Sequence, residues 1–183
     1  KRVFEVLRAS QCAFSYRDSV FKHDLKGTCI IESVIFRLSK KKPKIPTYQR
    51  VEEVLVEIQK EYSQDTLLLQ IRRAIEKIRS VKLPEPNTIA NVGSFFKNPL
   101  VDKVVVDNLK DTYPTVPFFV VGSRYKIPAG WLIEKIGYKG YEKDGVGVYK
   151  DNALVLVNTG SNDTQKILDL AFEIKEKVEV EFG

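Results

Sequence analysis

One short segment of the sequence, residues 91–99, combines residue types that could position reacting groups. It contains an adjacent pair of aromatic residues and several side chains able to donate a proton or a hydrogen bond: Ser94, Phe95, Phe96, Lys97 and Asn98. Large aromatic side chains are costly to leave in water, so we expect both rings to be buried and to anchor the segment as a loop. Gly93 permits a tight backbone immediately before Ser94. Such a loop could hold Ser94 in a reactive position, but the pattern fits equally well a turn whose polar residues contact only water.

The sequence gives little support to other common catalytic or metal centres. His23 is the only histidine and lies in a polar stretch, which argues against a histidine-based metal site and against a Ser-His-Asp centre. Cys12 and Cys29 lack the short paired spacing of a metal site and are too few for a disulfide framework, so we expect reduced cysteines. We therefore expect no bound metal, and residue spacing assigns no residue to a cofactor.

Positive charge is concentrated at the start of the chain, although the whole sequence carries a net charge of only +6. Residues 1–50 hold twelve Lys and Arg against four Asp and Glu, whereas residues 51–183 hold eighteen against twenty. The run Lys40–Lys44 could attract nucleic acid or a phosphate-bearing ligand, but a solvated loop is the interpretation that we favour. No apolar stretch approaches the roughly 18 residues that span a bilayer, so we expect no membrane partner.

Short apolar runs mixed with helical periodicities predict an α+β fold, in which small antiparallel sheets pack against helices in a two-part chain. Branched and aromatic residues predict strands at about residues 3–7, 28–38, 118–121, 146–149 and 154–158. Apolar spacing predicts helices at about residues 51–58, 67–78, 101–111, 128–136 and 163–178. Asp65 could cap the second helix, and Asn162 or Asp163 the last. Residues 81–86 should not be helical, because each proline pushes its predecessor into extended geometry.

Five ordered segments give the chain a specific resemblance to a known enzyme family. Gly93–Pro99 reads Gly-Ser-Phe-Phe-Lys-Asn-Pro, and Tyr16–Ser19 reads Tyr-Arg-Asp-Ser. The other matches are Lys82–Pro84, Ala129–Glu134 with Lys139–Gly140, and Ala153–Asn158. In this order they resemble the UDP-N-acetylenolpyruvoylglucosamine reductase family. The resemblance implies a cytoplasmic bacterial enzyme of peptidoglycan precursor synthesis, which uses FAD and NADPH to convert UDP-N-acetylglucosamine enolpyruvate to UDP-N-acetylmuramate.

The same resemblance assigns roles to individual residues. Ser94 corresponds to the serine that protonates the substrate after hydride transfer. The residues expected to bind the substrate are Tyr16, Arg79, Lys82, Asn98, Lys126 and Asn152. Of these, the lysines correspond to cations around the UDP diphosphate, and Tyr16 lies on a loop that closes over the substrate. Four residues depart from the family pattern and affect individual contacts: Ser15 for Gly, Phe119 for Tyr, Tyr149 for His and Asn152 for Gln.

The resemblance also implies how the chain is divided. Residues 1–78 correspond to the trailing part of the second FAD-binding domain, and residues 79–183 to the substrate-binding C-terminal domain. The N-terminal FAD-binding region of the same polypeptide would be the partner of this chain, and the family's catalytic glutamate would follow Gly183. We therefore expect the chain alone to bind FAD weakly or not at all and not to turn over. The alternatives are a non-catalytic nucleotide-sugar-binding module and a nucleic-acid-binding module, whereas the enzyme interpretation expects no nucleic acid.

Overall fold

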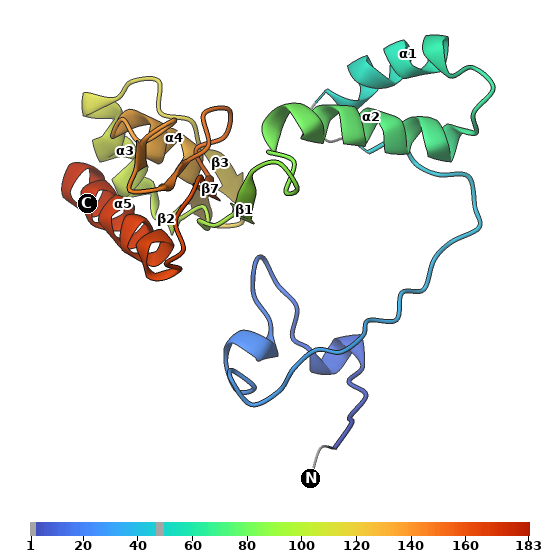
Figure 1. Cartoon of the computed structure of the whole chain (residues 1–183), viewed down its shortest axis with the longest axis horizontal. Helices are drawn as coiled ribbons and strands as arrows, with labels where there is room; N and C mark the ends of the chain where they lie inside the picture. Colours follow the sequence, from blue (N-terminus) through green and yellow to red (C-terminus); the bar gives the residue numbers. More distant parts are fainter. Residues whose placement is uncertain (1–2, 47–49) are drawn as a thin grey trace. The chain divides into compact units, whose positions relative to one another are not determined.

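A computed structural model describes residues 3–46 and 50–183 of the chain, and its internal contacts divide it into two units, Lys1–Lys42 and Pro43–Gly183 (Figure 1). In the first unit, irregular chain surrounds two short 3-10 turns, Ala9–Gln11 and Val20–Lys22. In the second unit, helices and strands form a helical hairpin and a sheet-containing region.

The strands predicted at residues 3–7 and 28–38 are wrong. Neither segment pairs with another strand among the described residues, so neither has regular secondary structure. Branched side chains favour an extended backbone, but a strand also needs a neighbour to satisfy its backbone hydrogen-bonding groups. The apolar side chains of the second segment are therefore left in solvent, with Ile30 94% and Ile35 90% exposed.

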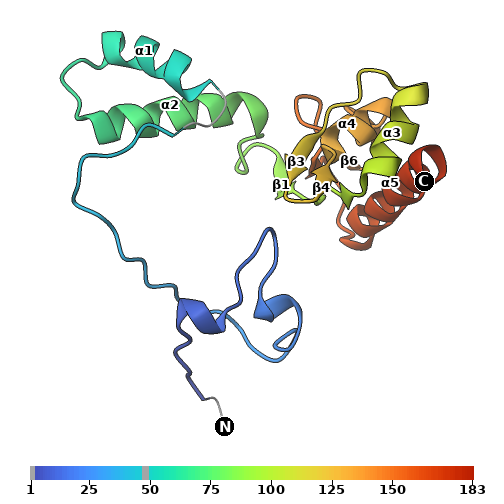
Figure 2. The same cartoon turned by 180° about the vertical axis from the view of Figure 1, so that it is seen from behind.

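The hairpin consists of α1 (Val51–Glu61) and α2 (Leu67–Lys82), which lie side by side in Figures 1 and 2. Apolar residues three and four apart give each helix one apolar face, and the two faces bury Leu55, Ile58, Ile71 and Ala74 against each other. Asp65 does not cap α2 as predicted, because Thr66 is the N-cap residue and the Asp65 carboxylate accepts from Arg73 Nε at 2.7 Å.

Helix α2 continues further than the sequence suggested, through Val81 and Lys82. The expectation that residues 81–86 are entirely non-helical is therefore wrong at its start. Pro84 restricts only the residue directly before it, and Leu83 accordingly has extended geometry, with φ −125° and ψ 134°.

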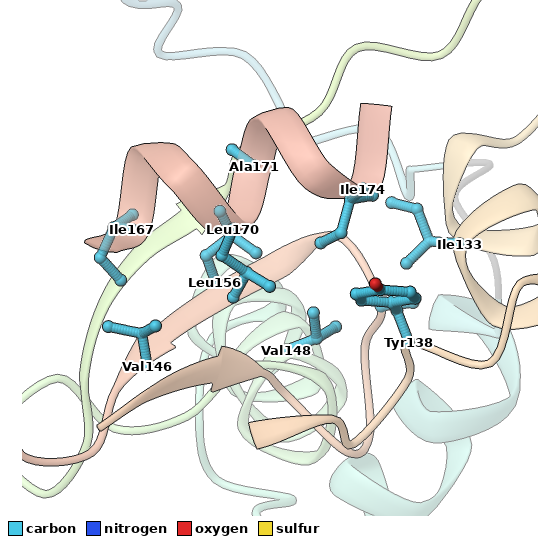
Figure 3. Packing of buried hydrophobic residues seen from close by; sticks show 10 residues of the cluster. Ile133, Tyr138, Val146, Val148, Leu156, Ile167, Leu170, Ala171 and Ile174 are labelled. Carbon is cyan, nitrogen blue, oxygen red and sulfur yellow. The ribbon is translucent and has the colours of Figure 1, made fainter. Parts of the chain in front are cut away.

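The first sheet has four antiparallel strands in the order β1-β7-β6-β5: Ala90–Ser94, Val155–Asn158, Val146–Val148 and Glu142–Lys143. Helix α5 (Gln165–Phe182) packs on this sheet, and Figure 3 shows Leu170 and Ile174 directed toward Leu156 and Val148. Each such buried side chain contributes about 1.5–3 kcal/mol to stability, so this core holds β7 in place.

The second sheet has three antiparallel strands in the order β2-β4-β3: Leu100–Val101, Arg124–Lys126 and Phe119–Val121. Helices α3 (Lys103–Thr112) and α4 (Ala129–Lys135) bury Val106, Leu109 and Leu132 in the accompanying core. Pro128 stands directly before α4, where its fixed φ suits a helix start, and Gly137 follows the helix with φ +82°.

The α+β class is confirmed, as are the paired strands predicted near residues 146–149 and 154–158. The Asp163 carboxylate accepts from the Gln165 backbone N–H at 2.8 Å, so this predicted residue does satisfy a donor at the start of α5. Within residues 3–46 and 50–183, no helix combines the length and apolar character needed to cross a membrane.

Candidate functional site

Strand β1 carries Ser94 on a β-bulge. Asn91 pairs with Val157 and Ser94 pairs with Val155, so β1 has one residue more than β7 over the same stretch. Gly93 lies within the bulge at φ +64°, a conformation that glycine adopts with little strain. The loop predicted to include residues 90–94 is therefore a strand, and its bulge re-aims the residues that follow it.

The Asn91 side chain braces this bulge. Its Oδ1 accepts from the Gly93 backbone N–H at 3.0 Å, and its Nδ2 donates to the Ile89 carbonyl at 2.9 Å. The same amide nitrogen lies 3.5 Å from the Pro84 carbonyl, in the segment that follows α2. The role of Asn91 was not predicted from the sequence, although an asparagine two residues before a glycine is a recognisable turn signal.

The two adjacent phenylalanines differ in burial. Phe96 is half-buried and packs against the core beneath α5, whereas Phe95 remains 43% exposed. The two rings meet edge to face, with centroids 5.2 Å apart. The expectation that both rings are buried is wrong for Phe95, which follows the end of β1 and contacts the Phe96 ring, while Phe96 packs against the core.

Asn98 connects the motif Gly93–Pro99, here called the signature segment, to the region of the second sheet. Its side-chain oxygen accepts from the Ala129 backbone N–H at 2.8 Å, at the start of α4. The following residue, Pro99, offers its carbonyl to the Ile127 N–H at 3.1 Å. The side-chain oxygen of Asn98 therefore accepts a hydrogen bond from within the protein, and the contact of Asn98 with the nucleotide sugar stays a prediction.

Lys126 lies close to this connection, because it is the cross-strand neighbour of both Leu100 and Phe119. Its Nζ lies 5.4 Å from the centroid of the Phe119 ring, within the range of a cation–π contact. Lys126 is half-buried, and Phe119 is 53% exposed. The departure at Phe119 therefore leaves an accessible aromatic face beside a positive charge.

Asn152 lies in the turn that leads into β7. Its side-chain oxygen accepts from the Leu154 N–H at 3.1 Å, and the Leu154 carbonyl accepts from the Phe95 N–H at 2.8 Å. A Cβ placed on Gly130 would lie 3.5 Å from Leu154, so Leu154 also borders the first turn of α4. Backbone pairing thus brings together the regions around four predicted site residues: Ser94, Asn98, Lys126 and Asn152.

Two other predicted residues, Arg79 and Lys82, lie exposed on the last turn of α2. The segment after this turn approaches the bulge through the Pro84 carbonyl described above. The structure does not by itself bring the two lysines, Lys82 and Lys126, onto a shared ligand, and their convergence stays a prediction.

Tyr16 lies in the first unit, on a tight turn whose ends, Ser15 and Asp18, exchange backbone hydrogen bonds of 3.1 and 3.3 Å. Tyr16 is 42% exposed. The Asp18 carboxylate oxygens lie 2.8 and 3.0 Å from His23 Nε2, which fixes the far side of the turn. Its predicted closure over a substrate stays a prediction.

A cavity of about 350 Å³ lies behind the signature segment, between Phe96, Ile127 and Val178. Its lining is mostly apolar, with Lys97, Lys175 and Glu179 among the exceptions. On the part of the chain that the structure describes, no cluster of three or more His, Cys, Asp or Glu side chains could hold a metal ion.

Burial of the hydroxyl, followed by its hydrogen bond to Asp151, raises the pKa of Tyr149. Tyr149 therefore stays neutral at physiological pH, unlike the histidine that the family pattern has at this position, which can change charge near pH 7.

The fold and the site define an α+β domain with two small antiparallel sheets, one of which contains a bulged strand that bears a serine. Residues 84–183 match the family model for the UDP-N-acetylenolpyruvoylglucosamine reductase, C-terminal domain. The chain therefore belongs to the UDP-N-acetylenolpyruvoylglucosamine reductase family, as its sequence motifs indicated.

Curated relatives agree with this assignment. The chain is 40% identical over 174 residues to the UDP-N-acetylenolpyruvoylglucosamine reductase of Aliivibrio fischeri, an alignment that covers 95% of this chain and 48% of that protein. It is 39% identical to the reductase of the same name from Flavobacterium johnsoniae, over 95% of this chain and 51% of that protein. For the Amoebophilus asiaticus reductase the identity is 42%, over 94% and 50%. The chain thus spans about half the length of these relatives.

Proposed function

We propose that residues 79–183 form the substrate-binding domain of a reductase that converts UDP-N-acetylglucosamine enolpyruvate to UDP-N-acetylmuramate, with Ser94 as the proton donor. The observation that supports the proposal is the pairing around the bulged end of β1: Ser94 pairs with Val155, close after Asn152, and the segment of Asn98 continues into Leu100, which pairs with Lys126. The names of the related reductases supply the substrate, and the motif supplies the role of Ser94.

The reaction adds a hydride to the methylene carbon of the enolpyruvyl group and a proton to the adjacent carbon. After hydride addition, negative charge develops on that adjacent carbon and on its carboxylate. The Ser94 O–H bond breaks as the new C–H bond forms, and the serine is left as an alkoxide that must regain a proton from solvent. A serine hydroxyl can act in this way only within about 3 Å of the carbanion and with cations or donors nearby.

The remaining predicted residues would hold the nucleotide sugar. Lys126, together with Lys82, would neutralise the diphosphate, a task that suits a mobile point charge. The exposed Phe119 ring beside Lys126 offers an apolar face to the nucleotide but no hydroxyl. Asn152 would donate a hydrogen bond to the ligand from its side-chain nitrogen, because its side-chain oxygen accepts from the Leu154 N–H. Arg79 would add positive charge, and Tyr16 would close over the bound substrate.

Two hollows on the described part of the chain do not fit FAD. The 350 Å³ cavity is small and mostly apolar, and a groove of about 800 Å³ beside α5 is lined by three glutamates and two lysines, so its net negative charge disfavours a diphosphate. The proposed roles of the residues of this chain therefore include no contact with FAD. The hydride, with NADPH as its source, is assigned to a full-length protein that includes an N-terminal FAD-binding region.

The exposed segment 28–38 supports such a partner region. Its apolar side chains and its unpaired backbone would be satisfied if a strand from the FAD-binding region paired with it. The chain alone should consequently bind FAD weakly and should not oxidise NADPH, and a yellow, active preparation of residues 1–183 would contradict this division of labour. Cytoplasmic location stays a prediction of the same proposal.

Replacing Ser94 with Ala in a full-length reductase that contains this chain tests the proposal. Rapid-mixing measurements should show that NADPH reduces the flavin at an unchanged rate, while reduction of the enolpyruvyl substrate slows by about 10²–10⁴-fold. Ser123→Ala, which removes an exposed hydroxyl from the turn between β3 and β4, is the matched control and should leave both rates unchanged. Normal substrate reduction by the Ser94→Ala protein would refute the assigned role.

A further inference from the structure

We propose that Asn91 is a positioning residue for Ser94, because its side chain fixes the bulge that sets the direction of the serine. This inference rests on the proposed function, since it concerns how the proton donor of that reaction is held. It assigns to Asn91 no contact with substrate and no part in the proton transfer.

Regular strand pairing between β1 and β7 is lost at the bulge. Over the residues between Asn91 and Ser94, β1 has two residues opposite the single residue Leu156 of β7. A bulge of this kind leaves one residue outside the ladder, and its backbone N–H must find another acceptor. The Asn91 side-chain oxygen accepts from the Gly93 N–H at 3.0 Å and fills this need.

The Asn91 side chain is itself held in place by hydrogen bonds. Its side-chain nitrogen donates to the Ile89 carbonyl at 2.9 Å, so the amide plane is fixed by bonds at both of its ends. Asn91 is also half-buried, which limits competition from water for these bonds. The side chain is thus a brace between the backbone before the bulge and the backbone inside it.

The peptide groups on both sides of Ser94 are fixed by hydrogen bonds. On its N-terminal side, the Gly93 N–H is bound by Asn91, and on its C-terminal side the Phe95 N–H donates to the Leu154 carbonyl at 2.8 Å. Ser94 therefore lies between two fixed peptide groups. Releasing the first of them would free the Gly93 backbone, which as a glycine has access to many φ values, and would swing the Ser94 side chain.

The size of the expected effect follows from the sensitivity of reactions to placement. A displacement of about 1 Å at a reacting group can slow a reaction by about 10²-fold. Asn91→Ala removes both side-chain bonds, so in the full-length reductase we expect substrate reduction to slow by about 10²-fold. Asn91→Asp keeps an acceptor for Gly93 and loses the donor to Ile89, so its reduction in rate should be smaller.

Four measurements separate positioning from a general loss of structure. Flavin reduction by NADPH should stay within about twofold of the unchanged protein, because it does not use Ser94. The dissociation constant of the substrate should change much less than the rate of its reduction. The solvent deuterium isotope effect on substrate reduction should increase, because protonation becomes the slow step. Amide hydrogen exchange should also become faster at Gly93, which is a readout independent of activity.

Asn87→Ala is the matched control, because Asn87 is an exposed asparagine in the same segment whose side-chain nitrogen donates to the nearby Glu85 carboxylate at 3.3 Å. It should leave both half-reactions unchanged. Asn91→Ser, which keeps a weaker acceptor for Gly93, provides an intermediate variant if the alanine variant does not fold.

The outcomes distinguish this inference from the proposed function. If Ser94→Ala leaves substrate reduction unchanged, the proposed function fails. If Ser94→Ala slows it and the three Asn91 variants do not, only the role of Asn91 is overturned. Equal slowing of both half-reactions, with weaker substrate binding, would show that Asn91 serves folding alone and would also overturn the inference.

Discussion

Gly93→Ala tests whether the bulge before Ser94 depends on a left-handed backbone. Gly93 has φ +64°, and an alanine Cβ built there would meet no atom within 4 Å. Crowding therefore contributes nothing, and the whole cost comes from the backbone conformation. An L residue in the left-handed region costs about 1–2 kcal/mol, and the lower entropy of the unfolded alanine chain offsets about 0.4–1 kcal/mol of this. We expect a net loss of about 1 kcal/mol in the free energy of unfolding.

Two other glycines provide controls for the same substitution. Gly130 lies in α4, where an added Cβ would make an ordinary 3.5 Å contact with Leu154, so Gly130→Ala should be neutral or stabilise the protein by up to about 1 kcal/mol. Gly147 lies in β6, where the added Cβ would come within 2.5 Å of the Tyr141 carbonyl oxygen. Gly147→Ala should therefore be the most destabilising of the three, because backbone must move.

Urea unfolding followed by circular dichroism measures these changes as shifts in the transition midpoint at constant slope. Gly93→Asn should cost less than Gly93→Ala, because asparagine tolerates positive φ better than alanine does. An alanine variant at 93 that is as stable as the unchanged protein, or an asparagine variant less stable than the alanine one, would refute the reasoning.

Two further predictions concern packing and pH. Phe96→Ala should lower the free energy of unfolding by at least about 1 kcal/mol more than Phe95→Ala, because only Phe96 packs into the core; equal losses in urea unfolding would contradict this. Burial, and then the hydrogen bond to Glu173, raise the pKa of Tyr138 above the value of 10.0 expected in the unfolded chain. The neutral hydroxyl is thus favoured by folding, so its contribution to stability is complete below about pH 10 and is lost as the pH rises further. Tyr138→Phe should flatten the fall in unfolding free energy above pH 10, and an unchanged pH dependence would argue against it.

The helices and the central hairpin of strands could be predicted from the sequence because their patterns are local. Apolar residues three and four apart define α2 and α5, and the branched runs around Val146–Val148 and Val155–Asn158 define strands that pair with each other. The extended segment 28–38 has the same local pattern but pairs with nothing among the described residues. Local composition therefore predicted a strand that only a distant partner could complete.

The motifs name candidate site residues, whose roles stay predictions, but they do not give the geometry of the segment that holds them. Ser94 and the lysines follow from the motifs, whereas the bulge depends on pairing with Val155 and Val157, about 60 residues further along the chain. Asparagine and glycine within residues 90–94 indicated a turn, so the strand was missed, and with it the role of Asn91. The exposure of Phe95 was missed because both rings were expected to anchor the segment, whereas only Phe96 packs against the core.

An NMR titration tests the central claim most directly. UDP-N-acetylglucosamine enolpyruvate is added to the protein, and the backbone amide shifts are compared with those produced by a polynucleotide at low and high salt. The account predicts that the nucleotide sugar shifts the amides of Ser94–Asn98, Lys126 and Asn152 most strongly, and that the polynucleotide leaves them unchanged. Salt-sensitive polynucleotide shifts centred on Lys40–Lys44, with no response of Ser94–Asn98 to the nucleotide sugar, would contradict it.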